Sequence, residues 1–314
     1  MKKISIIIAV YNIESYISKC LDSVIKQKGN DIEIIIVDDG STDNSLNICQ
    51  KYQKKDKRIR IIHQENKGLN SVRNVGFDNS TGEYIWHIDG DDYIEDNSID
   101  ILRKYIDKYD IIYFNYNKIE NNKLKKEKYD KKYDNLCDKY ILGYTTVWNK
   151  IFKRYLFFDD KFPEGNAYND IYIIPTLIYK TNSIIFIDNF LYNYVYRYNS
   201  LSHTRKFNLE DLLCCFNHIY NKLYNNYPDA VECFWVNQLL FYNYAKKIRY
   251  GNKYNYKAIN KILKDKFPKY YKNKYYNRNL YMKIYIKLIY YDMIFLVKLI
   301  TFIKLKVINE LKRK

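Results

Sequence analysis

Residues 87–93 read His-Ile-Asp-Gly-Asp-Asp-Tyr, and an apolar run, Tyr84-Ile85-Trp86, comes directly before them. An apolar run of this kind predicts a short buried strand, so three carboxylates stand at its C-terminal end, where open α/β sheets bind their ligands. Carboxylates packed this closely repel one another, and a divalent cation relieves that repulsion. Their hard oxygen atoms suit Mg²⁺ or Mn²⁺. Taken alone, the stretch predicts a metal–diphosphate site and a simple polar turn about equally well.

Strands and helices alternate around this stretch. Apolar and β-branched runs predict five strands, at residues 4–10, 32–37, 58–62, 84–88 and 110–116. Apolar residues at helical spacing predict a helix after each of the first four strands. This alternation predicts an α/β fold with a mostly parallel central sheet that is flanked by helices. The loops at residues 11–12, 38–43 and 89–92 then meet at one edge of that sheet, which favours a ligand site over an isolated turn.

Composition and charge limit the classes of function. The chain has 314 residues, of which 47% are hydrophobic, and a formal net charge of +17. That length allows one large domain, or one domain with a smaller appendage. A strongly basic chain favours nucleic acid, an anionic membrane surface or a phosphate-bearing ligand. No nucleic-acid-binding motif is present and the acidic edge would repel phosphate without a metal, so we expect no nucleic-acid partner.

The cysteines and glycines exclude several kinds of site. The six cysteines form no pair of C-x-x-C motifs, so a zinc site is not expected, and Cys20 and Cys49 fall on apolar helix faces as small buried thiols. This usage fits a reducing cytoplasm. The apolar run after Met1-Lys2-Lys3 is too short for a signal peptide. No G-x-G-x-x-G follows the first strand and no P-loop sequence occurs, which weakens a dinucleotide cofactor and excludes a P-loop.

The last third of the chain differs from the rest because helical patterns alone continue from about residue 207. We therefore expect one domain at residues 1–205 and a basic, Tyr- and Lys-rich helical region at 206–314. The final stretch, 280–311, is apolar but interrupted by Lys and Asp, so it is no clean transmembrane span. On a helix, Lys283, Lys287 and Lys298 fall within about a 60° arc. The segment then lies on anionic lipid or packs on the N-terminal domain, and we favour the first alternative.

Two further loops carry residues suited to a phosphorylated ligand. The loop Asp38-Asp39-Gly40-Ser41 has free carboxylates that could accept a hydrogen bond from a base N–H, although helix capping explains it equally well. Residues 66–76 begin a helix near the same edge, and a helix N-terminus together with Arg73 suits a diphosphate. The alternative for Arg73 is an ordinary surface arginine.

Several motifs, in this order, resemble those of family 2 glycosyltransferases with the GT-A fold. They are S-I-I-I-A-V-Y-N at 5–12, V-D-D-G-S-T-D at 37–43, K-G-x-x-x-x-R-N-x-G from Lys67, D-G-D-D at 89–92, W-N-K at 148–150 and F-P-E-G-x-x-Y-N-D at 162–170. The likeness covers residues up to about 200. Each motif alone is modest, but their order is very specific.

The resemblance implies a set of nucleotide-sugar contacts. Tyr11 would stack on the base, and Asp39 would accept a hydrogen bond from the base N–H. Ala9 would also line the nucleotide-sugar site. Arg73 would help to hold the nucleotide, and Asp89 would face the ribose or the metal.

The resemblance also implies the metal ligands. Asp91 would ligate Mn²⁺ or Mg²⁺, and Asp89 would share that role. His203 falls where related enzymes sometimes supply a further metal or diphosphate ligand, although a lone histidine is more often structural. Arg197 could also reach the diphosphate.

Asp170 would be the catalytic base. The family usually has Glu-Asp at this point, whereas this chain has Asn169-Asp170. The departure keeps the base but removes a neighbouring carboxylate, which bears on acceptor orientation. Asn169 also supports the alternative that the chain is a catalytically inactive nucleotide-sugar-binding module of the same fold.

The chemistry of glycosyl transfer agrees with these roles. A divalent cation stabilises the charge that develops on a diphosphate leaving group, and one positioned carboxylate takes the proton of the attacking hydroxyl. Direct displacement needs no second carboxylate nucleophile, so we expect inversion at the anomeric carbon. We expect transfer of a hexose or N-acetylhexosamine from a UDP-sugar to a glycan or lipid-linked saccharide in cell-surface polysaccharide or lipopolysaccharide synthesis. The basic helical tail favours a cytoplasmic enzyme that is peripheral on the inner face of the cell membrane.

Overall fold

The computed structural model describes residues 3–121, 123–128, 145–165, 168–198, 200, 208–242, 256–278, 280–293 and 295–297. Contacts within the chain divide it into two compact units, Met1–Ile219 and Tyr220–Lys314. The expected domain boundary at 205/206 lies outside the described residues, so the proposed division of functions stays a prediction.

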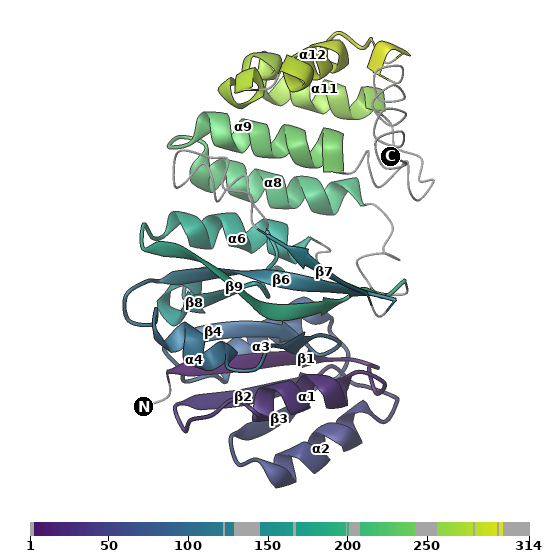
Figure 1. Cartoon of the computed structure of the whole chain (residues 1–314). Helices are drawn as coiled ribbons and strands as arrows, with labels where there is room; N and C mark the ends of the chain where they lie inside the picture. The colour runs from purple at the N-terminus through teal and green to yellow at the C-terminus, as the bar shows by residue number, and fades with distance from the viewer. Residues whose placement is uncertain are drawn as a thin grey trace, which may run out of the picture. The chain divides into compact units, whose positions relative to one another are not determined.

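A mixed sheet forms the centre of the first unit (Figure 1). Its strands run in the order β3-β2-β1-β4-β8-β6-β9-β5, and β7 pairs with β6. The bounds are β1 Ile4–Val10, β2 Ile32–Asp38, β3 Ile59–His63, β4 Tyr84–Asp89, β5 Tyr93–Ile94, β6 Ile111–Glu120, β7 Lys123–Glu127, β8 Lys150–Lys153 and β9 Ile184–Val195.

The half of the sheet that carries the three loops is parallel, as the sequence predicts. β1 pairs in parallel with β2 and with β4, and β2 pairs in parallel with β3. β1, β2 and β4 are buried almost throughout, which is why continuous runs of Ile and Val mark β1 and β2. The sheet continues differently beyond β4, because β8 pairs antiparallel with both β4 and β6, while β6 and β9 are parallel.

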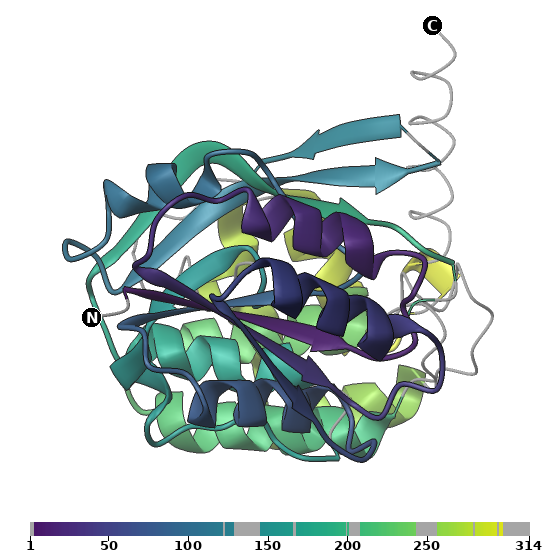
Figure 2. The ribbon, with the colours of Figure 1, turned by 90° about the horizontal axis from the view of Figure 1, so that it is seen from below.

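Helices cover both faces of this sheet. The bounds in the first unit are α1 Ile17–Ile25, α2 Ser45–Lys55, α3 Leu69–Asp78, α4 Ser98–Arg103 and α6 Asn169–Tyr179. One core cluster joins α1, α2 and α4 to one face of the strands, and two others join α3 and α6 to the opposite face. Figure 2 shows α1 and α3 on opposite sides of β1. The α/β architecture expected from the alternating pattern is confirmed.

The sequence pattern does not predict two short strands, β5 and β8, or the full length of a third, β9. β8 starts at the last residue of the W-N-K motif and has only four residues, and β5 has only two, so neither offers an alternating run long enough to recognise. β9 spans Ile184–Val195, and its second half is hard to recognise in the sequence because aromatic residues replace the β-branched ones. The region after Lys118 forms a β6–β7 hairpin as far as it is described.

The described elements after β9 are all helical, in agreement with the sequence. They are α8 Leu209–Leu223, α9 Pro228–Val236, the π-helix η2 Asn237–Tyr242, α11 Tyr256–Lys266, the 3₁₀ turns η3 Tyr270–Lys272 and η4 Lys274–Arg278, and α12 Leu280–Tyr290. α12 ends well before residue 311, because Asp292 adopts a left-handed conformation and pairs with Lys264. Among the described residues, none of the helices is both long enough and apolar enough to cross a membrane.

Candidate active site

The C-terminal ends of three parallel strands meet at one edge of the sheet. The register pairs Ala9 of β1 with Asp89 of β4, and Val10 of β1 with Asp38 of β2. The loops that follow these strands therefore start side by side. The sequence predicts this grouping, and the ladder of the sheet produces it.

Tyr11 and Asn12 form the first of these loops. Asn12 has a φ of 48°, and its Oδ1 accepts a hydrogen bond from the Thr42 amide at 2.8 Å. The Asn12 amide in turn donates to the Ser41 hydroxyl at 3.1 Å. These bonds tie the loop after β1 to the loop after β2. The neighbouring Tyr11 side chain is 47% exposed, so its ring is available to a ligand.

Asp39 is buried and organises the loop that leads into α3. Its Oδ1 accepts hydrogen bonds from the Lys67 amide at 2.9 Å and from Gln64 Nε2 at 2.7 Å. Its Oδ2 accepts from the Gly68 amide at 2.8 Å. Two backbone amides in succession on one carboxylate fix the start of α3. Recognition of a base N–H by Asp39 remains a prediction, and the structure adds this loop-forming role.

The turn at residues 89–92 is tight and requires glycine at its second position. The Asp92 amide donates to the Asp89 carbonyl at 2.9 Å, and the Gly90 amide donates to the Ala9 carbonyl at 3.0 Å. A Cβ atom on Gly90 would lie 2.6 Å from that carbonyl oxygen and 2.6 Å from Ile13 Cδ1. Gly90 thus lets the turn press against β1, which directs the carboxylates of Asp89 and Asp91 to the edge of the sheet.

Asp91 pairs with Arg197, which follows β9. Arg197 Nη2 contacts Asp91 Oδ2, and its guanidinium lies over the Tyr16 ring at 4.7 Å. Burial raises the pKa of Asp91, and the nearby Asp89 carboxylate raises it further, while Arg197 lowers it. Arg197 therefore lies beside the carboxylate that is expected to bind the metal, and its contact with a diphosphate stays a prediction.

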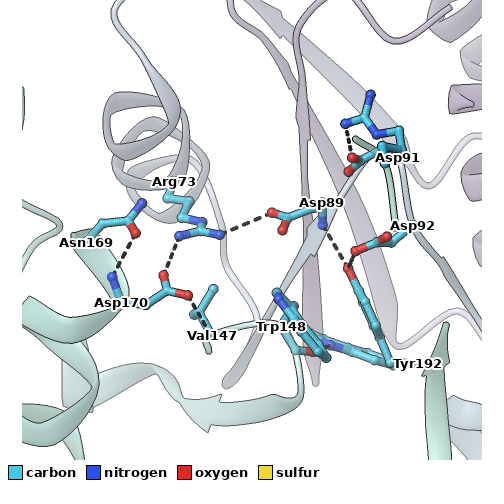
Figure 3. A network of polar contacts seen from close by, with 11 residues as sticks. Arg73, Asp89, Asp91, Asp92, Val147, Trp148, Asn169, Asp170 and Tyr192 are labelled. Atoms are coloured by element: carbon cyan, nitrogen blue, oxygen red, sulfur yellow. Dashed lines mark hydrogen bonds and ion pairs between the residues drawn. The ribbon is translucent and has the colours of Figure 1, made fainter. Parts of the chain in front are cut away.

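Arg73 joins two of the predicted site residues. Its side chain is 3% exposed, and it donates from Nη1 to Asp170 Oδ1 at 2.7 Å and from Nη2 to Asp89 Oδ1 at 3.1 Å. The guanidinium also lies 5.3 Å from the centre of the Phe162 ring. Burial alone would lower the pKa of Arg73, but the two carboxylates outweigh it and raise that pKa. Figure 3 shows Arg73 between the carboxylates of Asp89 and Asp170. Arg73 is therefore a buried bridge and no ordinary surface arginine.

Asp170 lies in the first turn of α6. Its Oδ2 accepts a hydrogen bond from the Val147 amide at 3.2 Å, and its own amide donates to Asn169 Oδ1 at 2.8 Å. The surrounding protein desolvates this carboxylate and raises its pKa; Arg73 opposes the shift, and Asp89 adds to it. The side chain keeps 22% of its surface exposed. A partly accessible carboxylate with a raised pKa is suited to accept a proton.

Asp89 and Asp91 are the two carboxylates that would hold a divalent cation. Their carboxylate oxygens are hard ligands. The negative charge of Asp89 raises the pKa of Asp91, and a bound cation would relieve the repulsion between the two carboxylates. Among the residues that the structure describes, no group of three or more His, Cys, Asp and Glu side chains is arranged to hold a metal. Mg²⁺ is commonly held by one or two carboxylates together with substrate phosphates, so the two fit this role. His203, the third expected ligand, lies outside the described residues.

Sequence reasoning missed one part of this network. Tyr192 of β9 donates its hydroxyl proton to Asp92 Oδ2 at 2.7 Å, and its ring stacks on Trp148 at a centroid distance of 4.7 Å. The W-N-K motif was a signal for Trp148, but a single tyrosine carries no signal in a chain that contains 37 of them. The role of the Val147 amide was also invisible, because a backbone donor has no sequence signature.

Comparison with known proteins identifies the family. The model of the family described as Glycosyl transferase family 2 matches residues 5–165. The Streptococcus pneumoniae glycosyltransferase GlyG is 31% identical over 226 residues, which cover 64% of this chain and 73% of that protein. Its glycosyltransferase GlyA is 36% identical over 218 residues, 64% of this chain. The chain spans 31% of the length of GlyA and 33% of that of the Bacillus subtilis putative glycosyltransferase EpsH.

Solved structures share the fold. The crystal structure of S. aureus TarS 1-349 in complex with UDP-GlcNAc has a TM-score of 0.64 at 23% identity, covering 76% of this chain and 73% of that one. A Pyrobaculum calidifontis mannosyltransferase in complex with GDP-Man and Mn²⁺ has a TM-score of 0.58 at 14% identity, covering 78% and 72%. The expected GT-A-type fold is confirmed. The chain belongs to glycosyl transferase family 2.

Proposed function

We propose that the chain is an inverting glycosyltransferase that moves a hexose or N-acetylhexosamine from a nucleotide sugar, with UDP as the nucleotide, to a hydroxyl of a glycan acceptor. Family membership supports transfer of a glycosyl group, and the arrangement of the site supports the roles of individual residues. The pathway that we propose is the synthesis of a cell-surface polysaccharide or lipopolysaccharide.

One observation carries this proposal. We call the sheet edge at the C-terminal ends of β1, β2 and β4 the donor edge, because the sugar donor is proposed to bind there. A single buried arginine, Arg73, binds the carboxylate of Asp89 at this donor edge and that of Asp170 at the start of α6. The two carboxylates are thereby held on opposite sides of one guanidinium. This arrangement suits a reaction in which a diphosphate leaves on one side while a proton is removed on the other.

Asp170 acts as the general base in this proposal. Its raised pKa and its partial exposure suit proton transfer from an acceptor hydroxyl. Arg73 holds Oδ1 and the Val147 amide holds Oδ2, so the carboxylate has a fixed direction. Direct displacement by the acceptor hydroxyl needs one base and no carboxylate nucleophile, so the proposed outcome is inversion.

The donor lies against the edge formed by β1, β2 and β4 in this proposal. Ala9, Tyr11 and Asp39 are assigned to the nucleotide, and Asp89 and Asp91 to Mn²⁺ or Mg²⁺. The cation, when bound, stabilises negative charge on the departing diphosphate. The choice of UDP is supported by TarS, whose structure contains UDP-GlcNAc. The mannosyltransferase with GDP-Man and Mn²⁺ supports the divalent cation and makes GDP the competing nucleotide.

The test is a screen of the purified chain against UDP-GlcNAc, UDP-galactose and GDP-mannose, each with and without Mn²⁺. Thermal stability reports binding, because a ligand of the native state raises it. Release of the nucleoside diphosphate reports turnover. We expect a UDP-sugar to stabilise the chain and to be turned over only with the cation. Binding without any turnover, with glycan acceptors supplied, would instead support an inactive binding module, and no binding would refute the proposal.

We also propose that the second unit binds the anionic inner face of the cell membrane and brings the site to a lipid-linked or growing glycan. Five of the exposed large hydrophobic side chains lie close together in its sequence, at Leu280, Ile284, Tyr291, Met293 and Phe295. Lys283 and Lys287 on α12 are exposed as well. Cys20, Cys49 and Cys233 are buried cysteines outside any disulfide, which supports a cytoplasmic location.

A further inference from the structure

Asp92, the third carboxylate of the 89–92 turn, is the one that the proposed chemistry does not use. It is 2% exposed, whereas the side chains of Asp89 and Asp91 are 27% and 18% exposed. Its Oδ1 accepts a hydrogen bond from the Val195 amide at 2.7 Å, and its Oδ2 accepts one from the Tyr192 hydroxyl at 2.7 Å. A buried carboxylate with two such donors is a structural anchor, and it fixes the turn to the end of β9.

The Tyr192 hydroxyl connects Asp92 to Asp89. It donates its proton to Asp92 and accepts a hydrogen bond from the Asp89 amide at 3.2 Å. One oxygen atom thus fixes both ends of the turn that presents Asp89 and Asp91. Figure 3 shows this hydroxyl between the two residues.

The Tyr192 ring continues the connection toward Asp170. It stacks on Trp148 with an angle of 17° between the ring planes. The Trp148 carbonyl accepts a hydrogen bond from Trp86 Nε1 at 2.9 Å, which fixes this residue to β4. The preceding residue, Val147, donates its amide proton to Asp170. Stacked rings and hydrogen bonds therefore lead from the donor edge to the proposed base, on a path separate from Arg73.

We infer that Asp92 and Tyr192 are positioning residues, which hold the Asp89–Asp91 turn in register with the Val147–Trp148 turn that orients Asp170. This inference rests on the proposed function, because it concerns the alignment of the donor edge with the base. Neither side chain contacts the reacting atoms. Their effect passes through the backbone of Asp89 and the ring of Trp148.

The test compares two tyrosines of the same strand. Tyr192→Phe removes the hydroxyl that joins Asp89 and Asp92 but keeps the ring that stacks on Trp148. Tyr194→Phe is the matched control, because Tyr194 also stacks on Trp148, at 5.6 Å and 2°, while its hydroxyl forms no hydrogen bond with the described residues. The probes are UDP and GDP, titrated by calorimetry with Mn²⁺, and nucleotide release from UDP-GlcNAc or GDP-mannose, whichever the wild type turns over.

We expect Tyr192→Phe to weaken Mn²⁺-dependent nucleotide binding about tenfold, the size of effect from losing one hydrogen bond to a charged group. Its kcat should fall further than its affinity, since the path to Asp170 is also loosened. Tyr194→Phe should match the wild type in both. A purely structural role would lower thermal stability alone, with affinity and kcat unchanged.

The outcomes separate the inference from the proposed function. Equal affinities and equal kcat values for Tyr192→Phe and Tyr194→Phe would overturn the inference and leave the function intact. A wild type that binds neither nucleotide would overturn the proposed function, and the inference with it. Should Tyr192→Phe fail to fold, the nearly isosteric Asp92→Asn tests the same hydrogen bond by changing its acceptor. It is expected to weaken Mn²⁺-dependent binding, and wild-type affinity in this variant would also overturn the inference.

Discussion

The guanidinium of Arg73 donates from Nη1 to Oδ1 of Asp170 across 2.7 Å, with only 3% of the arginine side chain exposed. The arginine is thus buried beneath the carboxylate that we assign as the base. The same guanidinium binds Asp89 through Nη2. A substitution of Arg73 therefore alters the surroundings of Asp89 and of Asp170 at the same time.

Replacing Arg73 by methionine should shift the pH dependence of transfer. The guanidinium lowers the pKa of Asp170 against the effects of burial and of Asp89, so its removal lets that pKa rise. The base is active when deprotonated, hence the acidic limb of the kcat profile should move to higher pH. Activity should therefore fall more at the acidic end of the profile than at its alkaline end. The substitution also leaves Asp89 and Asp170 without the guanidinium, which should lower the unfolding free energy by about 3 kcal/mol. This is the low end for a broken buried ion pair, because both carboxylates are partly exposed.

Two companion variants make this measurement specific. Arg73→Lys keeps the charge but offers one ammonium in place of a two-armed fork, so it should recover stability better than activity. Arg103→Lys changes an ion-paired arginine that binds Asp31 and Asp100. It should leave the pH profile unchanged, and an equal shift in Arg103→Lys would contradict the role given to Arg73.

Asp170→Asn should abolish transfer without abolishing donor binding. The amide keeps the size of the carboxylate and can still accept from the Val147 amide, but it cannot take a proton. Loss of a general base costs about 100- to 10,000-fold in kcat. Nucleotide affinity, measured by calorimetry, should stay near that of the wild type. Asp78→Asn, at a surface ion pair with Lys161, is the control, and full turnover by Asp170→Asn would remove the base from Asp170.

Asp91→Ala should abolish the response to the metal. In the wild type, we expect Mn²⁺ with UDP to raise the melting temperature, since a ligand at 100 times its Kd stabilises the native state by about 2.7 kcal/mol. The variant should lose this response, and the wild type should lose it on addition of a chelator. Asp96→Ala changes an exposed carboxylate five residues further along the chain and should respond as the wild type does. An undiminished Mn²⁺ response in Asp91→Ala would show that the metal binds elsewhere.

The strands that are buried on both faces of the sheet are the part of the fold that the sequence predicts, because such strands need continuous apolar runs. Ile4–Val10 has the predicted bounds of β1, because all but one of its residues are buried and all but Ser5 are apolar. The loops after β1, β2 and β4 could then be grouped by topology alone. β8 could not, because its four residues take their place from antiparallel pairing with β4 and β6, a choice that depends on distant strands.

The same difference separates the site residues. Asp89, Asp91 and Asp170 stand out because carboxylates beside apolar runs have few structural reasons to be there. The Arg73 bridge could not be predicted, because it joins α3 to α6 across 97 positions of sequence. Asp92 shows the opposite problem, since the sequence makes it look equivalent to Asp91. Only the hydrogen bonds from Tyr192 and Val195 reveal it as an anchor.

Lys150 gives a prediction for stability against pH. Its ammonium is fully buried, donates to the Thr146 carbonyl and to Asn149 Oδ1, and lies 4.5 Å from the centre of the Tyr113 ring. Burial lowers the pKa of Lys150 from 10.5 to about 7, against the influence of Asp170. Between these two pH values the unfolded chain holds this proton and the native chain does not. Stability from this group therefore rises with pH from about 7 to 10.5, by roughly 1 kcal/mol per pH unit in mid-window.

Lys150→Met should remove that contribution. The unfolding free energy, from urea titrations at pH 7.5 and 8.5, should increase with pH less steeply in the variant than in the wild type, by about 1 kcal/mol over the interval. Lys161→Met, at an exposed ion pair, should keep the wild-type slope. Identical slopes in all three proteins would mean that Lys150 has an ordinary pKa.

The second unit offers a prediction about membrane surfaces. Lys283 and Lys287 are exposed one turn apart on α12, beside exposed Leu280 and Ile284. One basic residue near an anionic surface contributes about 1 kcal/mol. Lys283→Gln with Lys287→Gln should therefore weaken sedimentation with phosphatidylserine-containing vesicles about 30-fold.

A matched double variant on the first unit decides whether this binding is specific. Lys125 and Lys126 are adjacent and exposed on β7, so Lys125→Gln with Lys126→Gln removes the same charge from another surface. It should bind the vesicles as the wild type does. Binding by the wild type should weaken with added salt and be much weaker on phosphatidylcholine alone, because it combines charge with apolar insertion. Leu280→Ser with Phe295→Ser should lower it at every salt concentration. Equal losses in the two lysine doubles would assign the binding to net charge alone and contradict a membrane surface on α12.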